Sequence, residues 1–279
     1  MEKIKYKILQ VLANYGFERK LIASEKLLDR TFKVRKGTIR TINQYDDAWM
    51  FVLSSKAVNI YDIGSNIGQS ALLMLYHDNV KKIVLADPNP KALAVAAENM
   101  IMNNLSPRCM FIPGFVSDKK GEEVDFYTVG AGEAGSKYRS FARTASSLRS
   151  HYKVSTNSLD SIVEETGITP DFIKVDVEGA EVDVLKGAVN TVRKAKCKFL
   201  VEVHSGEELS IQENTSMILD WCKENEYTAW YLSKGVPLSI EVLETRERYH
   251  VLLQPNNEPY PQYMKSVKEG AKLSLDLLR

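Results

Sequence analysis

The chain has 279 residues, of which 44% are hydrophobic and 26% charged, with a formal net charge of +1. This composition is typical of a globular protein with a sizeable core, and the near-neutral charge excludes an overall basic nucleic-acid-binding domain. No apolar run approaches the ~20 residues needed to span a bilayer, and the first residues lack a signal-peptide apolar region. We therefore expect a cytoplasmic protein without membrane contact. The three cysteines are too far apart for a CxxC site, and we expect no bound metal.

The charge is concentrated at the N-terminus. Residues 1–40 contain eleven Lys and Arg residues against four acidic ones, a net of +7, which leaves −6 for the remainder. A solvated helical face explains this excess, and attraction for an anionic substrate or partner is the alternative. Apolar spacing predicts helices over residues 1–30 and 46–54 and a short strand over residues 38–43. We predict that residues 1–56 are a mainly helical addition to the core domain, not a separate domain, and that the core domain covers residues 57–279.

A strand, a glycine turn and a helix follow at residues 59–69. The buried strand ends near Asp62, and two glycines then bracket a tight turn that lets a ligand approach the backbone. Asn66 occupies the middle position of the turn, so the G-x-G-x-x-G pattern of nicotinamide sites is absent. The turn resembles the first motif of class I S-adenosylmethionine-dependent methyltransferases, and an ordinary strand-to-helix turn is the alternative. The resemblance implies cofactor contacts from Asp62, Gly64, Ser65, Asn66, Gly68 and Gln69.

A second strand, residues 82–86, ends in Asp87, nineteen residues after Gly68. A carboxylate there is placed to accept hydrogen bonds from two ribose hydroxyls, whereas the alternative is a turn aspartate before proline. A third strand, residues 109–116, ends beside the expected adenine position, and Pro113 predicts that it is bulged or lies at an edge. The cofactor-binding residues predicted in these two segments are Asp87, Pro88, Asn89, Val116 and Ser117.

Residues 121–157 interrupt the alternation of strands and helices. They include a glycine-rich stretch over residues 130–136, and we predict a mobile substrate lid, with a disordered surface loop as the alternative. Regular elements then resume. The pattern predicts helices over residues 158–165, 211–224 and 264–278, strands over residues 171–177 and 198–203, and an antiparallel edge pair over residues 227–232 and 249–253.

The segment Asp176-Val-Glu-Gly-Ala-Glu181 resembles the signature of the FkbM family of methyltransferases. Matching neighbours are Leu159-Asp160 upstream and Glu202-Val-His204 downstream, so the resemblance covers about residues 58–205. The family more often has Glu where this chain has Asp87. The resemblance implies a Rossmann-like α/β fold with a seven-stranded, mostly parallel sheet and helices on both faces. It also implies S-adenosyl-L-methionine as cofactor and O-methylation of sugars or other hydroxylated natural products.

Methyl transfer to a hydroxyl group benefits from a general base. We place Asp176 near the cofactor's amino group, with Glu178 or His204 as the base; the alternatives are a helix N-terminal acid for Glu178 and a structural histidine for His204. The expected partner is a small-molecule acceptor, for which the basic N-terminus leaves an anionic group as one option. An RNA or protein methyltransferase that uses the basic N-terminus, and a non-catalytic nucleotide-binding module, are rival interpretations. The sequence specifies neither the acceptor nor an oligomeric state.

Overall fold

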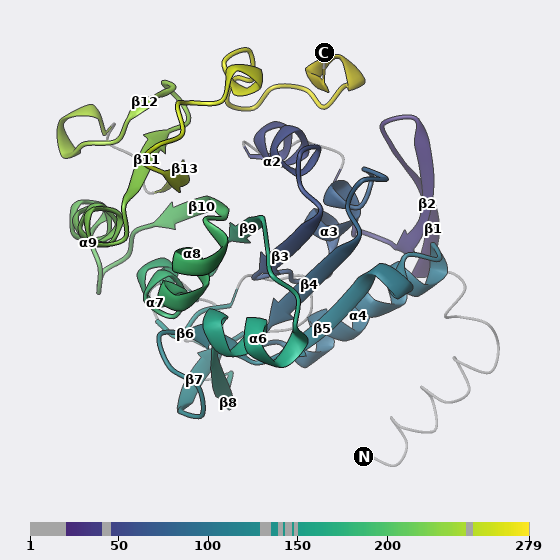
Figure 1. Cartoon of the computed structure of the whole chain (residues 1–279). Coiled ribbons are helices and arrows are strands. Elements are labelled where there is room, and N and C mark those ends of the chain that lie inside the picture. The colour runs from purple at the N-terminus through teal and green to yellow at the C-terminus, as the bar shows by residue number, and fades with distance from the viewer. Residues whose placement is uncertain are drawn as a thin grey trace.

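The computed structural model describes residues 21–40, 46–128, 135–138, 142, 147, 150–243 and 248–278. Its centre is an eight-stranded sheet in the order β12-β11-β13-β10-β9-β3-β4-β5 (Figure 1). The strands are β3 (Asn59–Ile63), β4 (Lys82–Asp87), β5 (Cys109–Pro113), β9 (Phe172–Val175), β10 (Lys198–His204), β11 (Tyr227–Tyr231), β12 (Val236–Pro237) and β13 (Arg248–Pro255). Strand β13 is antiparallel to both of its neighbours. The expected seven-stranded α/β arrangement is confirmed, with the two-residue β12 added at one edge.

Side chains alternate between the two faces of the sheet, as the two-residue period of a strand requires. In β3, Ile60 joins one hydrophobic cluster, and Tyr61 and Ile63 join the other. The first face packs against helices α2 (Asp47–Ser54), α3 (Gln69–Met74) and α4 (Pro90–Met102). The second packs against helices α6 (Leu159–Thr166), α7 (Glu181–Lys186), α8 (Val189–Ala195) and α9 (Ile211–Glu224). Buried parallel strands are therefore covered on both sides.

The N-terminal part of the chain differs from the helical prediction. Residues 22–35 form a β-hairpin of β1 (Ile22–Leu27) and β2 (Arg30–Arg35), while residues 1–20 lie outside the described part. Phe32 and Val34 are buried between charged neighbours, a two-residue alternation that favours a strand. The predicted strand at 38–43 is not formed by its described residues 38–40, whereas the helix at 46–54 is confirmed as α2.

A second, three-stranded sheet joins the predicted lid to the segment before it; its strands are β6 (Phe115–Ser117), β7 (Glu123–Tyr127) and β8 (His151–Ser158). The third predicted strand is divided at Gly114 into β5 and β6, and β5 lies at the edge of the main sheet, as Pro113 predicted. Strand β8 was not predicted. Most of the glycine-rich stretch lies outside the described residues, which return at residues 135–138.

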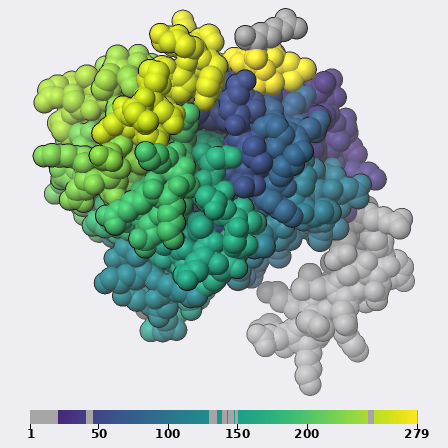
Figure 2. Space-filling model, viewed as in Figure 1, coloured from purple at the N-terminus to yellow at the C-terminus, as the bar shows by residue number. Residues whose placement is uncertain are grey.

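The C-terminal segment is not the predicted helix over residues 264–278. It contains only the short 3-10 turns Gln262–Met264 and Leu275–Leu278. Gly270 between them has a left-handed φ of 65°, which an α-helix does not accommodate. Apolar side chains such as Met264 and Val267 instead join the cluster around α2, and Figure 2 shows this segment (yellow) against the surface beside that helix. No helix among the described residues is both long and apolar enough to cross a membrane.

Candidate active site

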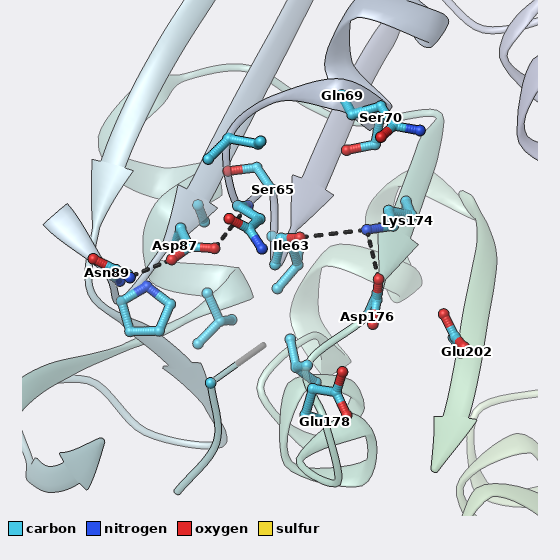
Figure 3. A pocket seen from close by; sticks show the side chains of 18 of the residues that line it. Ile63, Ser65, Gln69, Ser70, Asp87, Asn89, Lys174, Asp176, Glu178 and Glu202 are labelled. Carbon is cyan, nitrogen blue, oxygen red and sulfur yellow. Dashed lines mark hydrogen bonds and ion pairs between the residues drawn. The ribbon is translucent and has the colours of Figure 1, made fainter. Parts of the chain in front are cut away.

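A cavity of about 330 Å³ opens where the central parallel strands end. Ligands bind at this edge in open α/β sheets. Figure 3 shows side chains from β4, β9 and β10 directed toward this space. Ten predicted site residues line it: Gly64, Ser65, Asn66, Gln69, Asp87, Pro88, Asn89, Val116, Asp176 and Glu178. The lining omits Asp62, Gly68, Ser117 and His204, so the structure brings most, but not all, of the predicted residues together.

The glycine turn is shaped by a close backbone approach. Gly64 has a φ of +81°, and a Cβ atom there would lie 1.8 Å from the carbonyl oxygen of Asp176. Gly68 has a φ of +84° at the start of α3, where a Cβ would lie 3.0 Å from that of Ala96. Only glycine therefore lets the turn after β3 lie this close to the backbone of Asp176, which follows the parallel neighbour β9. The resulting open backbone between Gly64 and Gln69 forms one wall of the cavity.

The Asp87 carboxylate is held at the end of β4 by two backbone donors. The N–H of Asn66 donates to its Oδ2 and the N–H of Asn89 to its Oδ1, both at 2.8 Å (Figure 3). Burial raises the pKa of Asp87 to about 6, although these two hydrogen bonds favour the ionised form. The turn and the second strand thus fix one carboxylate beside the cavity.

Lys174 lines the cavity, and the sequence analysis did not assign it to the site. Its Nζ lies 3.1 Å from Oδ2 of Asp176 and 3.6 Å from Oδ1 of Asp62, and all but 6% of its side chain is buried. Burial alone would lower the pKa of this amine, but the carboxylates of Asp176, Asp62 and Asp46 outweigh it and raise the pKa. Asp62 also accepts a 2.6 Å hydrogen bond from Ser70 Oγ. Asp62 therefore lies behind the turn and positions Lys174, which in turn positions Asp176.

Glu178 lies at the entrance to α7 in an uncommon backbone conformation. Its φ is +51°, a value that non-glycine residues seldom adopt, and Ser136 Oγ donates a 2.7 Å hydrogen bond to its carbonyl oxygen. Burial raises the pKa of the Glu178 carboxyl to about 7, an effect that His204 opposes and Asp176 reinforces. Strained residues of this kind cluster at functional sites. Glu178 thus lines the cavity with a carboxyl group whose pKa is about 7.

His204 lies behind Glu178. Its Nδ1 is 2.8 Å from Oε1 of the fully buried Glu181, and its Nε2 is 3.6 Å from Oε2 of Glu178. Burial would lower the pKa of His204, but the carboxylates of Glu181, Glu178 and Glu202 outweigh it and raise the pKa to about 10. Asn214 Nδ2 donates to the other oxygen of Glu181 at 3.0 Å. This network holds a cationic imidazole next to Glu178.

Further residues that the sequence analysis did not assign to the site line the same cavity. They include Asp46, Glu202, Arg248 and Phe126. Glu202 lies two positions before His204 on β10, so the two-residue period of the strand places it on the same face; that spacing could have revealed it. Asp46 and Phe126 come from distant segments, and no local pattern connects them with the site. The basic residues of the first twenty positions lie outside the described part.

Comparison with known proteins identifies relatives of this chain. The family model described as "Methyltransferase FkbM domain" matches residues 62–229. The 2-O-methyltransferase NoeI of Sinorhizobium fredii is 28% identical over 163 residues, covering 54% of this chain and 64% of that protein. The hexuronic acid methyltransferase AglP of Haloferax volcanii is 28% identical over 148 residues, covering 53% and 56%. The crystal structure of the FkbM methyltransferase from Methylobacillus flagellatus is 14% identical, covers 79% of this chain and 46% of its own, and has a TM-score of 0.46.

Proposed function

Because the chain belongs to the FkbM methyltransferase family, we propose that it transfers a methyl group from S-adenosylmethionine to a hydroxyl group of a sugar. The chain spans 64% and 56% of the lengths of the two curated relatives, both named as methyltransferases, one of them of hexuronic acid. The observation that carries the proposal is the cavity itself, in which the glycine turn and Asp87 lie beside the carboxylates of Asp176 and Glu178.

The residues around the turn fit an adenosyl group with a cationic tail. Gly64 keeps the turn close to the backbone of Asp176, where a Cβ atom would collide, and Asp87 presents a carboxylate held by two backbone donors. In the proposal Asp87 binds the ribose hydroxyls, Val116 contacts the adenine, and Asp176 pairs with the amino group of the methionine part. Bound S-adenosylmethionine supplies an electrophilic methyl group on a sulfonium. Lys174 fixes the position of Asp176 through their 3.1 Å ion pair.

We assign the general base to Glu178. Its carboxylate lines the cavity, and a pKa of about 7 lets it accept a proton from an acceptor hydroxyl near neutral pH. His204 is the weaker candidate, because the residue is 5% exposed, lies outside the cavity lining and has its Nδ1 in contact with Glu181. In the proposal His204 is a positioning residue that holds Glu178 from behind, and Ser136 holds the Glu178 backbone.

Calorimetry with S-adenosylhomocysteine and with NAD tests the cofactor assignment. We expect saturable binding of one S-adenosylhomocysteine per chain, and no binding of NAD, because the dinucleotide-type glycine pattern is absent. Replacement of Gln69, which lines the cavity, provides a variant with an altered wall and an intact turn. Binding of NAD alone would contradict the proposal and indicate a nicotinamide enzyme on a similar fold.

A further inference from the structure

Beside the cavity, Asp46, Glu202 and His250 bring three potential metal-ligand atoms within 4.8 Å of one another. They come from three separate parts of the chain: the residue before α2, strand β10 and strand β13. All three are buried, with exposed fractions of 7%, 6% and 5%. Asp46 and Glu202 also line the cavity, so the cluster lies between the core and the space available to an acceptor.

The Glu202–His250 pair is fixed by the sheet. The two residues are directly opposite each other on the antiparallel strands β10 and β13, and Nε2 of His250 lies 3.6 Å from Oε2 of Glu202. The other oxygen of Glu202, Oε1, lies 3.0 Å from Nη1 of Arg248. Arg248 thus orients the carboxylate through one oxygen and leaves Oε2 directed at the imidazole. Trp49 lies against the His250 ring, with centroids 5.6 Å apart, and restricts its rotation.

His250 is buried without the hydrogen bonds that its ring nitrogens normally make. Within the described part of the chain, neither Nδ1 nor Nε2 has a hydrogen-bond partner. Asp46 precedes α2 as its N-cap residue, yet its side chain makes no capping hydrogen bond. Buried polar groups are nearly always satisfied, so a buried imidazole of this kind, facing two carboxylates, needs an explanation. A cation between them satisfies Nε2 of His250 and both carboxylates at once.

We propose that Asp46, Glu202 and His250 bind a divalent metal ion. Two ligand atoms that are each about 2.1 Å from one ion lie roughly 3 Å apart when adjacent and about 4.2 Å apart when opposite. The 3.6 Å between Oε2 of Glu202 and Nε2 of His250 falls in this range, and all three ligand atoms lie within 4.8 Å of one another. Two carboxylates and one imidazole favour Mn²⁺, Fe²⁺ or Zn²⁺ over Ca²⁺, which prefers oxygen ligands alone. This site departs from the expectation of no metal, which depended on local spacing, because its three ligands come from distant segments.

The role of the ion rests on the proposed methyltransferase function. Three protein ligands leave coordination positions toward the cavity, where an acceptor oxygen can bind. A bound ion lowers the pKa of that hydroxyl, as it does for coordinated water. The hydroxyl proton passes to the Glu178 carboxylate, the oxygen forms the new O–C bond, and the S–C bond breaks with its electron pair remaining on sulfur. The ion also offsets the negative charge of the carboxylates around the acceptor.

Direct binding of Mn²⁺ tests the site without any acceptor. The full chain, treated with a chelator and dialysed, is titrated with MnCl₂ while free Mn²⁺ is followed by electron paramagnetic resonance. We expect one ion per chain, and at least roughly tenfold weaker binding in Asp46→Asn, Glu202→Gln and His250→Gln, each judged folded by its melting curve. His151→Gln is the control, because His151 is an exposed histidine on β8 and its loss leaves Mn²⁺ affinity unchanged.

The outcomes separate the metal site from the proposed function. Absence of Mn²⁺ and Zn²⁺ binding to the unmodified chain, or equal affinity in a folded Asp46→Asn variant, overturns the site and leaves His250 as a protonated ion-pair partner. If His250→Gln does not fold, the isosteric Asp46→Asn variant decides the question. Stoichiometric metal binding without methyl transfer to any sugar supports the site but contradicts the proposed function.

Discussion

The Nδ1 atom of His204 lies 2.8 Å from Oε1 of Glu181, and both side chains are buried against the end of β10. This contact joins the strand to helix α7 directly behind the cavity. It defines a structural task for His204 that is separate from proton transfer, because removing the cationic partner of a buried carboxylate is strongly destabilising. The same contact fixes the ring that faces Glu178.

Replacing His204 with alanine is expected to lower stability more than chemistry. The buried carboxylate of Glu181 would lose its partner, and breaking such a buried pair costs about 3–5 kcal/mol of stability. Urea unfolding measures this loss, and His151→Ala is the control because that histidine is exposed. A His204→Ala variant with unchanged stability and turnover reduced 10²–10⁴-fold would instead identify His204 as the base.

Glu178→Gln is expected to lower turnover by about 10²–10⁴-fold, the usual contribution of a positioned base. The affinity for S-adenosylhomocysteine should change little, since the amide keeps the shape of the side chain. Turnover of the unmodified protein should rise with pH through about 7, because only the ionised carboxylate accepts a proton and burial raises the pKa of Glu178 to about 7. A flat pH profile from 6 to 8, with chemistry rate-limiting, would remove Glu178 from the role.

The raised pKa of Glu178 also makes the stability of the folded chain depend on pH. The pKa of Glu178 is raised above the 4.5 of an unperturbed glutamate, so the folded chain binds more protons than the unfolded chain between those two values. Its contribution to the free energy of unfolding should therefore fall as the pH rises from about 4.5 to about 7. Comparison of Glu178→Gln with the unmodified protein across this range isolates the effect, and a stability difference that is independent of pH would contradict it.

Gly64→Ala is expected to disrupt the cofactor turn. The new Cβ would lie 1.8 Å from the backbone oxygen of Asp176, and the segment must shift to relieve the collision. Gly121→Ala is a matched control, because Gly121 has a similar φ of +86° but a Cβ atom there would meet nothing within 4 Å. In this control, the free energy of unfolding should fall only by the backbone strain of a left-handed alanine, about 1–2 kcal/mol. Equal melting temperatures for the two variants would show that the close approach is unimportant.

Asp87→Ala is expected to weaken S-adenosylhomocysteine binding by about 1–3 kcal/mol, the cost of losing hydrogen bonds to a charged group. Calorimetry at pH 8 measures this loss with Asp87 ionised. The unmodified protein should also bind more weakly below pH 6, where the carboxyl becomes protonated. Asp87 also accepts hydrogen bonds from the backbone of Asn66 and Asn89, which hold the turn in place. Asp87→Asn removes the charge but keeps the size of the side chain, so its comparison with Asp87→Ala separates the two effects. Unchanged affinity in both variants would exclude Asp87 from the cofactor site.

Local patterns in the sequence were sufficient to predict much of this fold. Ser158 forms the predicted N-cap of α6, and Gly167 ends that helix at a φ of +66°. The placement of Asp87 at the end of β4 and of Asp176 just after β9 also follows from local signals. The hairpin at residues 22–35 was missed because its Leu and Ile residues also fit a helical spacing. Asp46, Lys174 and His250 acquire their importance only from tertiary contacts, which no single segment encodes.

Transfer of a labelled methyl group tests the central claim most directly. The full chain is incubated with methyl-labelled S-adenosylmethionine and a panel of neutral hexose and hexuronate glycosides, and products are separated by mass. We predict a labelled methyl ether on a sugar oxygen, formed by the unmodified protein and strongly reduced in Glu178→Gln. Label that reaches RNA or protein but no sugar, or a Glu178→Gln variant as active as the unmodified protein, would contradict this claim.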